Sequence, residues 1–75
     1  MLARTIAYQR LREIILSGEL SQDEPLSERR LSERLEIGRM PIREALKELA
    51  KDGLVRVHGG RGTFIRQLSL NEVRD

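Results

Sequence analysis

Residues 27–53 read SERRLSERLEIGRMPIREALKELAKDG, and they contain two helical patterns separated by a short turn. The first pattern opens on Ser27, whose hydroxyl suits the capping position of a helix, and two leucines then follow four residues apart. Ile37 and Gly38 interrupt the pattern. The spacing predicts a short helix over residues 28–36 that ends at this pair.

The second pattern is the strongest helical signal in the chain. Pro41 is tolerated in a first helical turn, because the N–H group that proline lacks is unpaired there in any case. The apolar residues recur at the spacing of one helix face: Ile42, Ala45, Leu46, Leu49 and Ala50. We expect a helix over residues 39–52, with Gly53 just after it. Two helices joined by a turn that contains glycine form a helix-turn-helix.

The flanking sequence adds one helix before this motif and a hairpin after it. An apolar stripe over residues 2–16 is followed by a Ser-Gly pair, which predicts a first helix and its end. A loop over residues 19–26 follows. Beyond Gly53 the apolar period changes to two, and a glycine-rich turn at residues 59–62 separates two short runs. The expected fold is mainly α with a small β-hairpin: a winged helix-turn-helix with three helices and a two-stranded wing.

Composition excludes several classes of function. A chain of 75 residues has room for one small core and not for a multidomain enzyme. Cysteine is absent and His58 is the single histidine, so we expect no thiol catalysis, catalytic triad or metal site. No run of apolar residues is long enough to cross a membrane. The expectation is a cytoplasmic protein that is not an enzyme and has no cofactor and no membrane partner.

Charge is distributed unevenly along the chain. Residues 1–37 carry six basic and seven acidic side chains, whereas residues 38–67 carry seven basic and three acidic ones. Most of the 14 basic residues are arginines, which form forked hydrogen bonds with phosphates and guanine edges. The basic half indicates an anionic polymer as partner, and a solvated surface with scattered arginines is the alternative.

Basic residues recur every fourth position on the outer side of the second motif helix: Arg39, Arg43, Lys47 and Lys51. The N-terminal end of such a helix is the part that meets base edges in a major groove. Met40, at the same end, can pack against a thymine methyl group. Two basic candidates have an acidic neighbour that can hold them instead, Glu44 for Lys47 and Glu33 for Arg29. Lys51 is expected to face only solvent.

Residues 8–67 resemble the DNA-binding domain of GntR-family bacterial transcription regulators. The resemblance runs through five segments: LREIILSGEL (11–20), LSERRL (26–31), GRMPIREAL (38–46), LAKDGLV (49–55) and GRGTFI (60–65). Three positions depart from the family: Gln22-Asp23 replaces Pro-Gly, Gly38 replaces serine or threonine, and Met40 replaces a common threonine.

The resemblance implies which residues would contact DNA. Arg29 matches a family arginine that reaches the DNA from the first helix of the motif. Arg39 and Arg43 match the arginines of the recognition helix, which contact guanine edges and phosphates. The remaining positions match the wing, which enters the minor groove: Gly59, Gly60 and Arg61.

The resemblance also implies a longer protein. It is similar to the subgroup whose C-terminal domain is all-helical and binds small carboxylate effectors, and that domain would begin near Leu70. We expect residues 1–67 to form the DNA-binding domain, and residues 68–75 to be a linker or the start of the effector domain. A capping-box pattern at residues 69–72 fits a new helix there. A homodimer would read the two half-sites of a palindromic operator.

Two functions from different classes are open. The first is a sequence-specific DNA-binding domain of a transcription regulator, expected to be a repressor, with residues 39–52 in a major groove of double-stranded DNA and residues 59–62 in a minor groove. The second is a winged helix that serves as a protein–protein interaction module, in which the basic side chains meet an acidic partner. Arginines on both the helix and the wing favour DNA, because they match two adjacent grooves.

Overall fold

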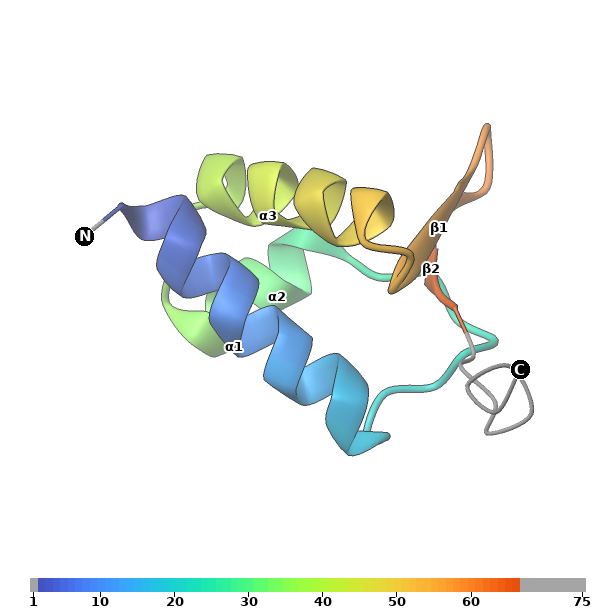
Figure 1. The fold of residues 1–75 in the computed structure, drawn as a ribbon. Coiled ribbons are helices and arrows are strands. Elements are labelled where there is room, and N and C mark those ends of the chain that lie inside the picture. Colours follow the sequence, from blue (N-terminus) through green and yellow to red (C-terminus); the bar gives the residue numbers. More distant parts are fainter. Residues whose placement is uncertain (1, 67–75) are drawn as a thin grey trace.

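The computed structural model describes residues 2–66, which form three helices and one hairpin. In chain order these are α1 (Ala3–Ser17), α2 (Glu28–Leu35), α3 (Arg39–Lys51), β1 (Val55–His58) and β2 (Gly62–Ile65). Helix α1 packs along α3, and the hairpin extends beyond the end of α3 as a wing (Figure 1). The winged helix-turn-helix expected from the sequence is confirmed, and the helix ends differ from the expected ones by single residues.

Two features expected near the C-terminal end of the chain cannot be compared with the structure. The boundary expected at residue 67 and the capping box at residues 69–72 lie outside the described residues. Within residues 2–66, no helix has the length and apolar character needed to cross a membrane.

Helix α1 ends at a glycine, as the sequence predicts. Its buried residues Ala7, Leu11 and Ile15 lie on one face. Gly18 adopts a left-handed φ of 80°, and its N–H donates to the Ile15 carbonyl at 3.3 Å. An L side chain is strained in this conformation, so glycine is the residue that stops the helix here.

Ser27 caps α2 as expected: its Oγ accepts a hydrogen bond from the Arg30 backbone N–H at 3.2 Å. This bond satisfies one of the N–H groups that the first turn of a helix leaves unpaired. Glu28 follows as the first residue of α2, where its negative charge is favourable beside the positive end of the helix dipole.

The turn between α2 and α3 differs from the expectation, which ended the first motif helix at Ile37 and Gly38. Helix α2 ends at Leu35, and the left-handed residue is Glu36, with a φ of 56°. The backbone N–H of Glu36 and that of Ile37 both donate to the Ser32 carbonyl and close the helix one residue early. Gly38 lies in the turn as expected and is the N-cap of α3, with a φ of −57° that any residue could adopt.

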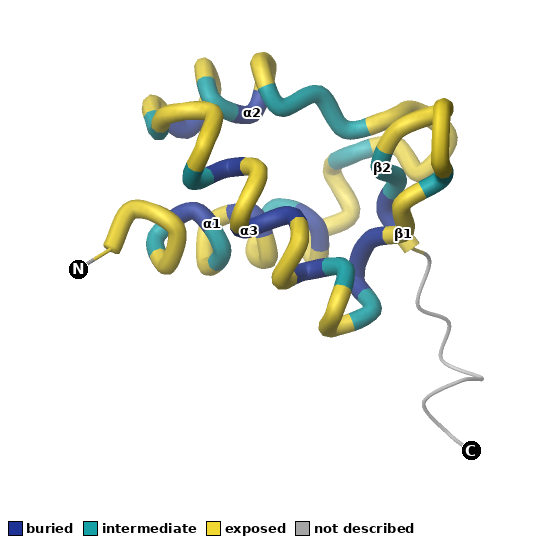
Figure 2. Tube along the Cα trace, turned by 90° about the horizontal axis from the view of Figure 1, so that it is seen from above, coloured by how far each residue is buried: buried dark blue, intermediate teal, exposed yellow. Residues whose placement is uncertain are grey.

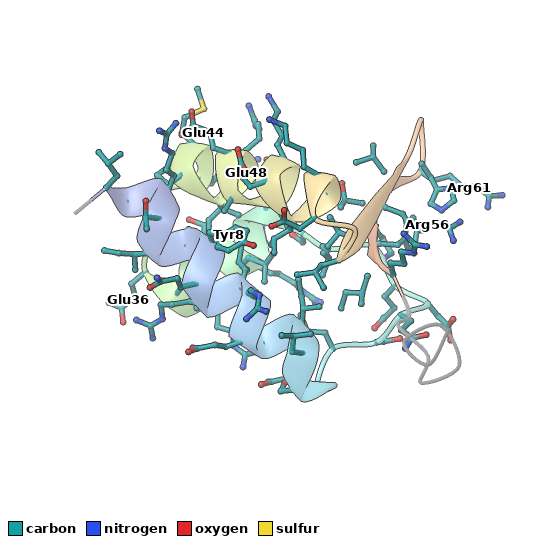
Figure 3. All side chains as sticks on the ribbon, in the orientation of Figure 1. Tyr8, Glu36, Glu44, Glu48, Arg56 and Arg61 are labelled. Carbon is teal, nitrogen blue, oxygen red and sulfur yellow. The ribbon has the colours of Figure 1, made fainter. Side chains whose placement is uncertain are left out.

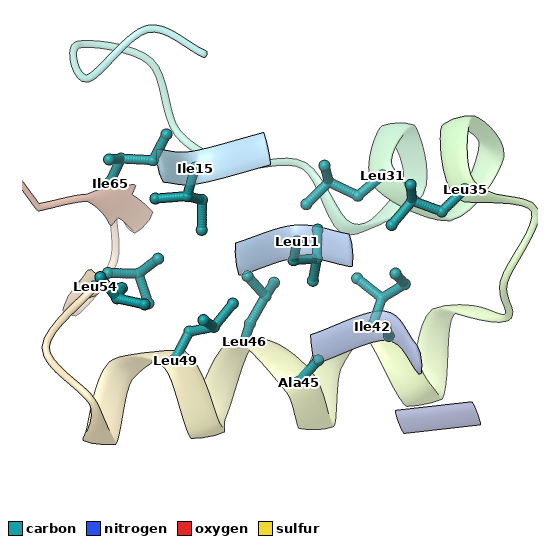
Figure 4. Close-up of a cluster of buried hydrophobic side chains, with 12 residues drawn as sticks. Leu11, Ile15, Leu31, Leu35, Ile42, Ala45, Leu46, Leu49, Leu54 and Ile65 are labelled. Atoms are coloured by element: carbon teal, nitrogen blue, oxygen red, sulfur yellow. The ribbon is translucent and has the colours of Figure 1, made fainter. Parts of the chain in front are cut away.

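One hydrophobic core joins the three helices to the hairpin (Figure 4). Helix α3 contributes its predicted stripe, of which Ala50 is half-buried and the other four residues are buried. Leu11, Ile42 and Leu49 lie at its centre and are almost completely shielded from water. Figure 2 shows the buried segments turned inward on all three helices and at the base of the hairpin. Because each fully buried leucine or isoleucine contributes about 1.5–3 kcal/mol, this cluster carries most of the stability of so small a domain.

The hairpin is antiparallel and keeps its base in the core. Val55 pairs with Ile65 at the base, and His58 pairs with Gly62 near the tip. One feature was not expected from the sequence: Leu26, placed in a loop, forms an isolated bridge with Thr63, and its N–H donates to the Thr63 carbonyl at 2.7 Å. The segment before α2 therefore holds the outer edge of the wing in place.

Candidate nucleic-acid interface

Helix α3 carries a basic row and an acidic row on different sides. The basic row is exposed and consists of Arg39, Arg43, Lys47 and Lys51. The acidic row, Glu44, Glu48 and Asp52, borders a groove of about 360 Å³ between α3 and α1. Tyr8 of α1 reaches across and donates a hydrogen bond to the Asp52 carboxylate (Figure 3). A polyanion would be repelled by the acidic row and attracted by the basic row.

The hydroxyl of Tyr8 is held in its protonated form by this contact. Its hydrogen bond to the Asp52 carboxylate is the largest of the effects that raise the pKa of Tyr8 above the ordinary value of 10.0. Arg12, also on α1, acts in the opposite direction. On the side of α3 that faces α1, the helix packs against α1, and Asp52 just after the helix accepts the Tyr8 hydrogen bond.

Arg43 is held by a carboxylate from the start of α2. Its Nε lies 3.2 and 3.1 Å from the two Glu28 oxygens, and its Nη2 donates to Glu28 Oε1 at 3.0 Å. These bonds hold the pKa of Glu28 below its ordinary value and raise that of Arg43. The sequence did not reveal this contact, because 15 residues separate the two.

A cavity lies between α3 and the wing. It has a volume of about 260 Å³ and is lined by Glu28, Arg43, Leu46, Lys47, Val57 and Thr63. Val57 is 67% exposed although it is apolar. Sequence reasoning missed Val57 and Thr63 as interface candidates. The period of two along β1 places Val57 on the same face as buried Val55, but it cannot show that the core ends between them.

The wing presents basic side chains away from α3. Arg61 lies at the tip and Arg56 on β1, and both point outward in Figure 3. A shallow cavity of about 380 Å³ on this face is lined by both and by Arg66, with Asp23 from the loop before α2. Gly59 and Gly60 are exposed beside Arg61. Sequence reasoning missed Arg56 and Arg66, although their alternation with the buried strand residues is a readable signal.

The other predicted site residues are exposed and loosely held. Arg29 lies 3.9 Å from Glu33, and their side chains are 76% and 68% exposed, so this expected pair leaves Arg29 free to move. Lys51 lies 3.8 Å from Glu48. The alternative pair of Lys47 with Glu44 does not form in the part of the chain that the structure describes.

The structure thus brings most of the predicted residues into two groups. Helix α3 carries Arg39, Met40, Arg43 and Lys47 on its exposed side, and the wing tip carries Gly59, Gly60 and Arg61. Arg29 lies on α2, one residue after the carboxylate that holds Arg43. Residues 2–66 contain no group of three or more histidine or acidic side chains placed to hold a metal ion.

Comparison with known proteins identifies the same region. Residues 3–65 match the family model described as bacterial regulatory proteins, gntR family. The transcriptional repressor RspR of Escherichia coli K12 is 35% identical over 68 residues, which cover 91% of this chain and 30% of that protein. The transcriptional repressor NagR of Bacillus subtilis 168 is 40% identical over 65 residues, covering 85% of this chain and 27% of NagR.

A solved structure matches in fold as well. The crystal structure of a GntR-family transcriptional regulator from Pseudomonas syringae pv. tomato DC3000 superposes with a TM-score of 0.76 at 34% identity, covering 99% of this chain and 33% of that one. The chain therefore spans about a third or less of the length of these relatives. From the family match and the shared fold we conclude that this chain belongs to the GntR family of bacterial regulatory proteins, as the DNA-binding domain of a transcription regulator.

Proposed function

We propose that α3 enters a major groove with its basic row while the wing reaches the adjacent minor groove. The observation that supports this most strongly is the division of charge on α3: the basic row is exposed next to the wing, and the acidic row is turned to α1. A helix with basic side chains on all sides would leave its orientation open. Here only one side is compatible with phosphates.

The exposed side chains suggest a role for each residue. Arg39 and Arg43, in the N-terminal half of α3, would meet base edges, and Met40 would pack against a thymine methyl group. Lys47 lies one turn further along and would contact a phosphate. Arg29 would brace the complex from α2. At the wing tip, Gly59 and Gly60 would let the backbone approach closely, and Arg61 would enter the narrow groove.

The function of the whole regulator extends beyond this domain. RspR and NagR are named repressors, which supports repression as the role of the longer protein. We place the boundary of the DNA-binding domain at residue 67, with residues 68–75 leading to an all-helical effector domain that binds a small carboxylate. A homodimer in the cytoplasm would bind a palindromic operator. The effector would change the distance between the two DNA-binding domains of the dimer. This function involves neither catalysis nor a cofactor within residues 1–75.

Replacing Arg39 by alanine tests the proposed orientation. A duplex would first be selected from a random pool, and fluorescence anisotropy would then compare it with a scrambled duplex. The variant should lose about 1–3 kcal/mol of binding free energy on the selected duplex and much less on the scrambled one. The control is Arg12→Ala, an exposed arginine of α1 on the side of the acidic row.

The same titration separates DNA binding from the alternative, a protein–protein interaction module. An equal loss on both duplexes would reduce Arg39 to a phosphate contact. If the parent chain binds no duplex even at low salt, where phosphate contacts are strongest, the proposal is refuted and an acidic protein partner is favoured.

A further inference from the structure

We propose, on the basis of the DNA-binding role proposed above, that Glu28 is a positioning residue that makes Arg43 specific for guanine. Of the four ion pairs in residues 2–66, this one joins α2 to α3 and lies on the cavity between α3 and the wing. The pair places the Glu28 carboxylate against Arg43 of the basic row. A carboxylate in a DNA interface opposes phosphate binding, so its presence calls for a role in selectivity.

The geometry leaves one defined edge of Arg43 for DNA. Glu28 occupies the side edge of the guanidinium, formed by Nε and Nη2. A guanidinium has five N–H donors in a rigid plane. The end edge, formed by Nη1 and the remaining N–H of Nη2, is therefore unoccupied by Glu28. Two parallel donors at this edge match the O6 and N7 acceptors of guanine, which is the commonest specific contact of arginine in the major groove.

Glu28 is itself held firmly enough to act as a support. Its side chain is 29% exposed and that of Arg43 is 48% exposed, far less than in the loose pair of Arg29 and Glu33. The hydrogen bonds from Arg43 lower the pKa of Glu28, so the carboxylate stays charged under ordinary conditions. A long arginine side chain loses rotational freedom when it binds, and a support that orders it beforehand reduces that cost.

The contact also disfavours the wrong partner. A free Arg43 could turn to any nearby phosphate, which would strengthen binding to every sequence alike. With Glu28 on its side edge, Arg43 gains less from a phosphate because the two anions repel each other. Glu28 should therefore weaken binding to unrelated DNA and sharpen the choice of base at one position.

The test is a selection from a random duplex pool with the 75-residue chain. The parent should enrich a guanine at one position, and Arg43→Ala should lose that preference, a change of roughly 5- to 150-fold. Glu28→Gln should lower the preference for guanine at the same position by roughly three- to tenfold and leave or increase binding to a scrambled duplex. Glu33→Gln removes the same charge from the same helix without touching Arg43 and should keep the parent's preference.

The double variant Glu28→Gln/Arg43→Ala completes the cycle. If Glu28 acts through Arg43, the double variant should show no loss at the guanine position beyond that of Arg43→Ala alone. Thermal melts of all variants check that each is folded. A guanine preference in Glu28→Gln equal to that of Glu33→Gln would overturn the assignment, as would equal losses at every base position. A folded parent that enriches no duplex would instead overturn the proposed function, and this assignment with it.

Discussion

Replacing Arg61 by alanine should weaken DNA binding and leave the fold intact. Arg61 is exposed at the wing tip, between Gly60 and Gly62, whose φ angles are 80° and 115°. Its backbone N–H donates to the His58 carbonyl at 2.9 Å, and alanine retains that bond. The side chain forms no ion pair within residues 2–66. Stability should therefore change by no more than about 0.5 kcal/mol.

The binding change follows from the number of phosphates that the domain neutralises. One arginine fewer should reduce the slope of log K against log salt by about 0.9. Between about 50 and 200 mM salt, this difference alone changes the ratio of parent to variant affinity roughly three- to fourfold. If Arg61 lies in a minor groove, the loss should be larger next to A·T-rich flanks, whose narrow groove concentrates negative potential.

The assay is a salt titration by fluorescence anisotropy on two duplexes that differ only in their flanks. Arg12→Ala on α1 serves as the control, because it removes the same charge from the side of the acidic row. An unchanged slope together with no flank preference would show that the wing does not enter a groove, and would support the protein-contact alternative. A large drop in melting temperature would show that Arg61 supports the fold.

Two further predictions concern stability. Leu49→Ala, at the fully shielded centre of the core, should cost about 2–5 kcal/mol and lower the melting temperature by tens of degrees, whereas Leu16→Ala, at a position 50% exposed, should cost far less. Similar circular dichroism melts for the two would mean that the core is assigned wrongly. Because the folded-state pKa of Tyr8 is raised, its contribution to stability is complete below the unfolded pKa of about 10 and is lost as the pH rises above it, through the higher folded-state pKa. Tyr8→Phe, which cannot donate to Asp52, should lower stability at neutral pH and flatten this alkaline loss in melts recorded from pH 8 to 11; an alkaline loss equal to the parent's would contradict this.

Much of the architecture could be predicted because it depends on interactions within one turn of helix or one pair of strands. The stripe of α3, the cap at Ser27 and the left-handed Gly18 each follow from local spacing, local hydrogen bonds or local backbone freedom. The basic row belongs to the same class, because residues four apart on a helix share a side whatever the helix packs against.

The conformation of the turn between α2 and α3 could not be predicted from the local sequence. Glycine can adopt the left-handed conformation most easily, yet Gly38 in the turn after α2 does not adopt it. The structure uses Glu36 instead. The next residue, Ile37, is half-buried and packs against the core, a contact that the local pattern does not reveal.

The sequence by itself determined the elements, their order, the family and the residues that share the exposed side of α3. The tertiary structure alone decided which elements meet: Glu28 behind Arg43, Val57 beside the cavity rather than in the core, and Leu26 against the edge of the wing. These contacts join segments of the chain 15 to 37 residues apart. Such contacts depend on the angles at which helices and hairpin pack, which are set by the whole core and by no single period in the sequence. Many residues of the candidate interface could therefore be named from the sequence, whereas the contact between Glu28 and Arg43 became visible only in three dimensions.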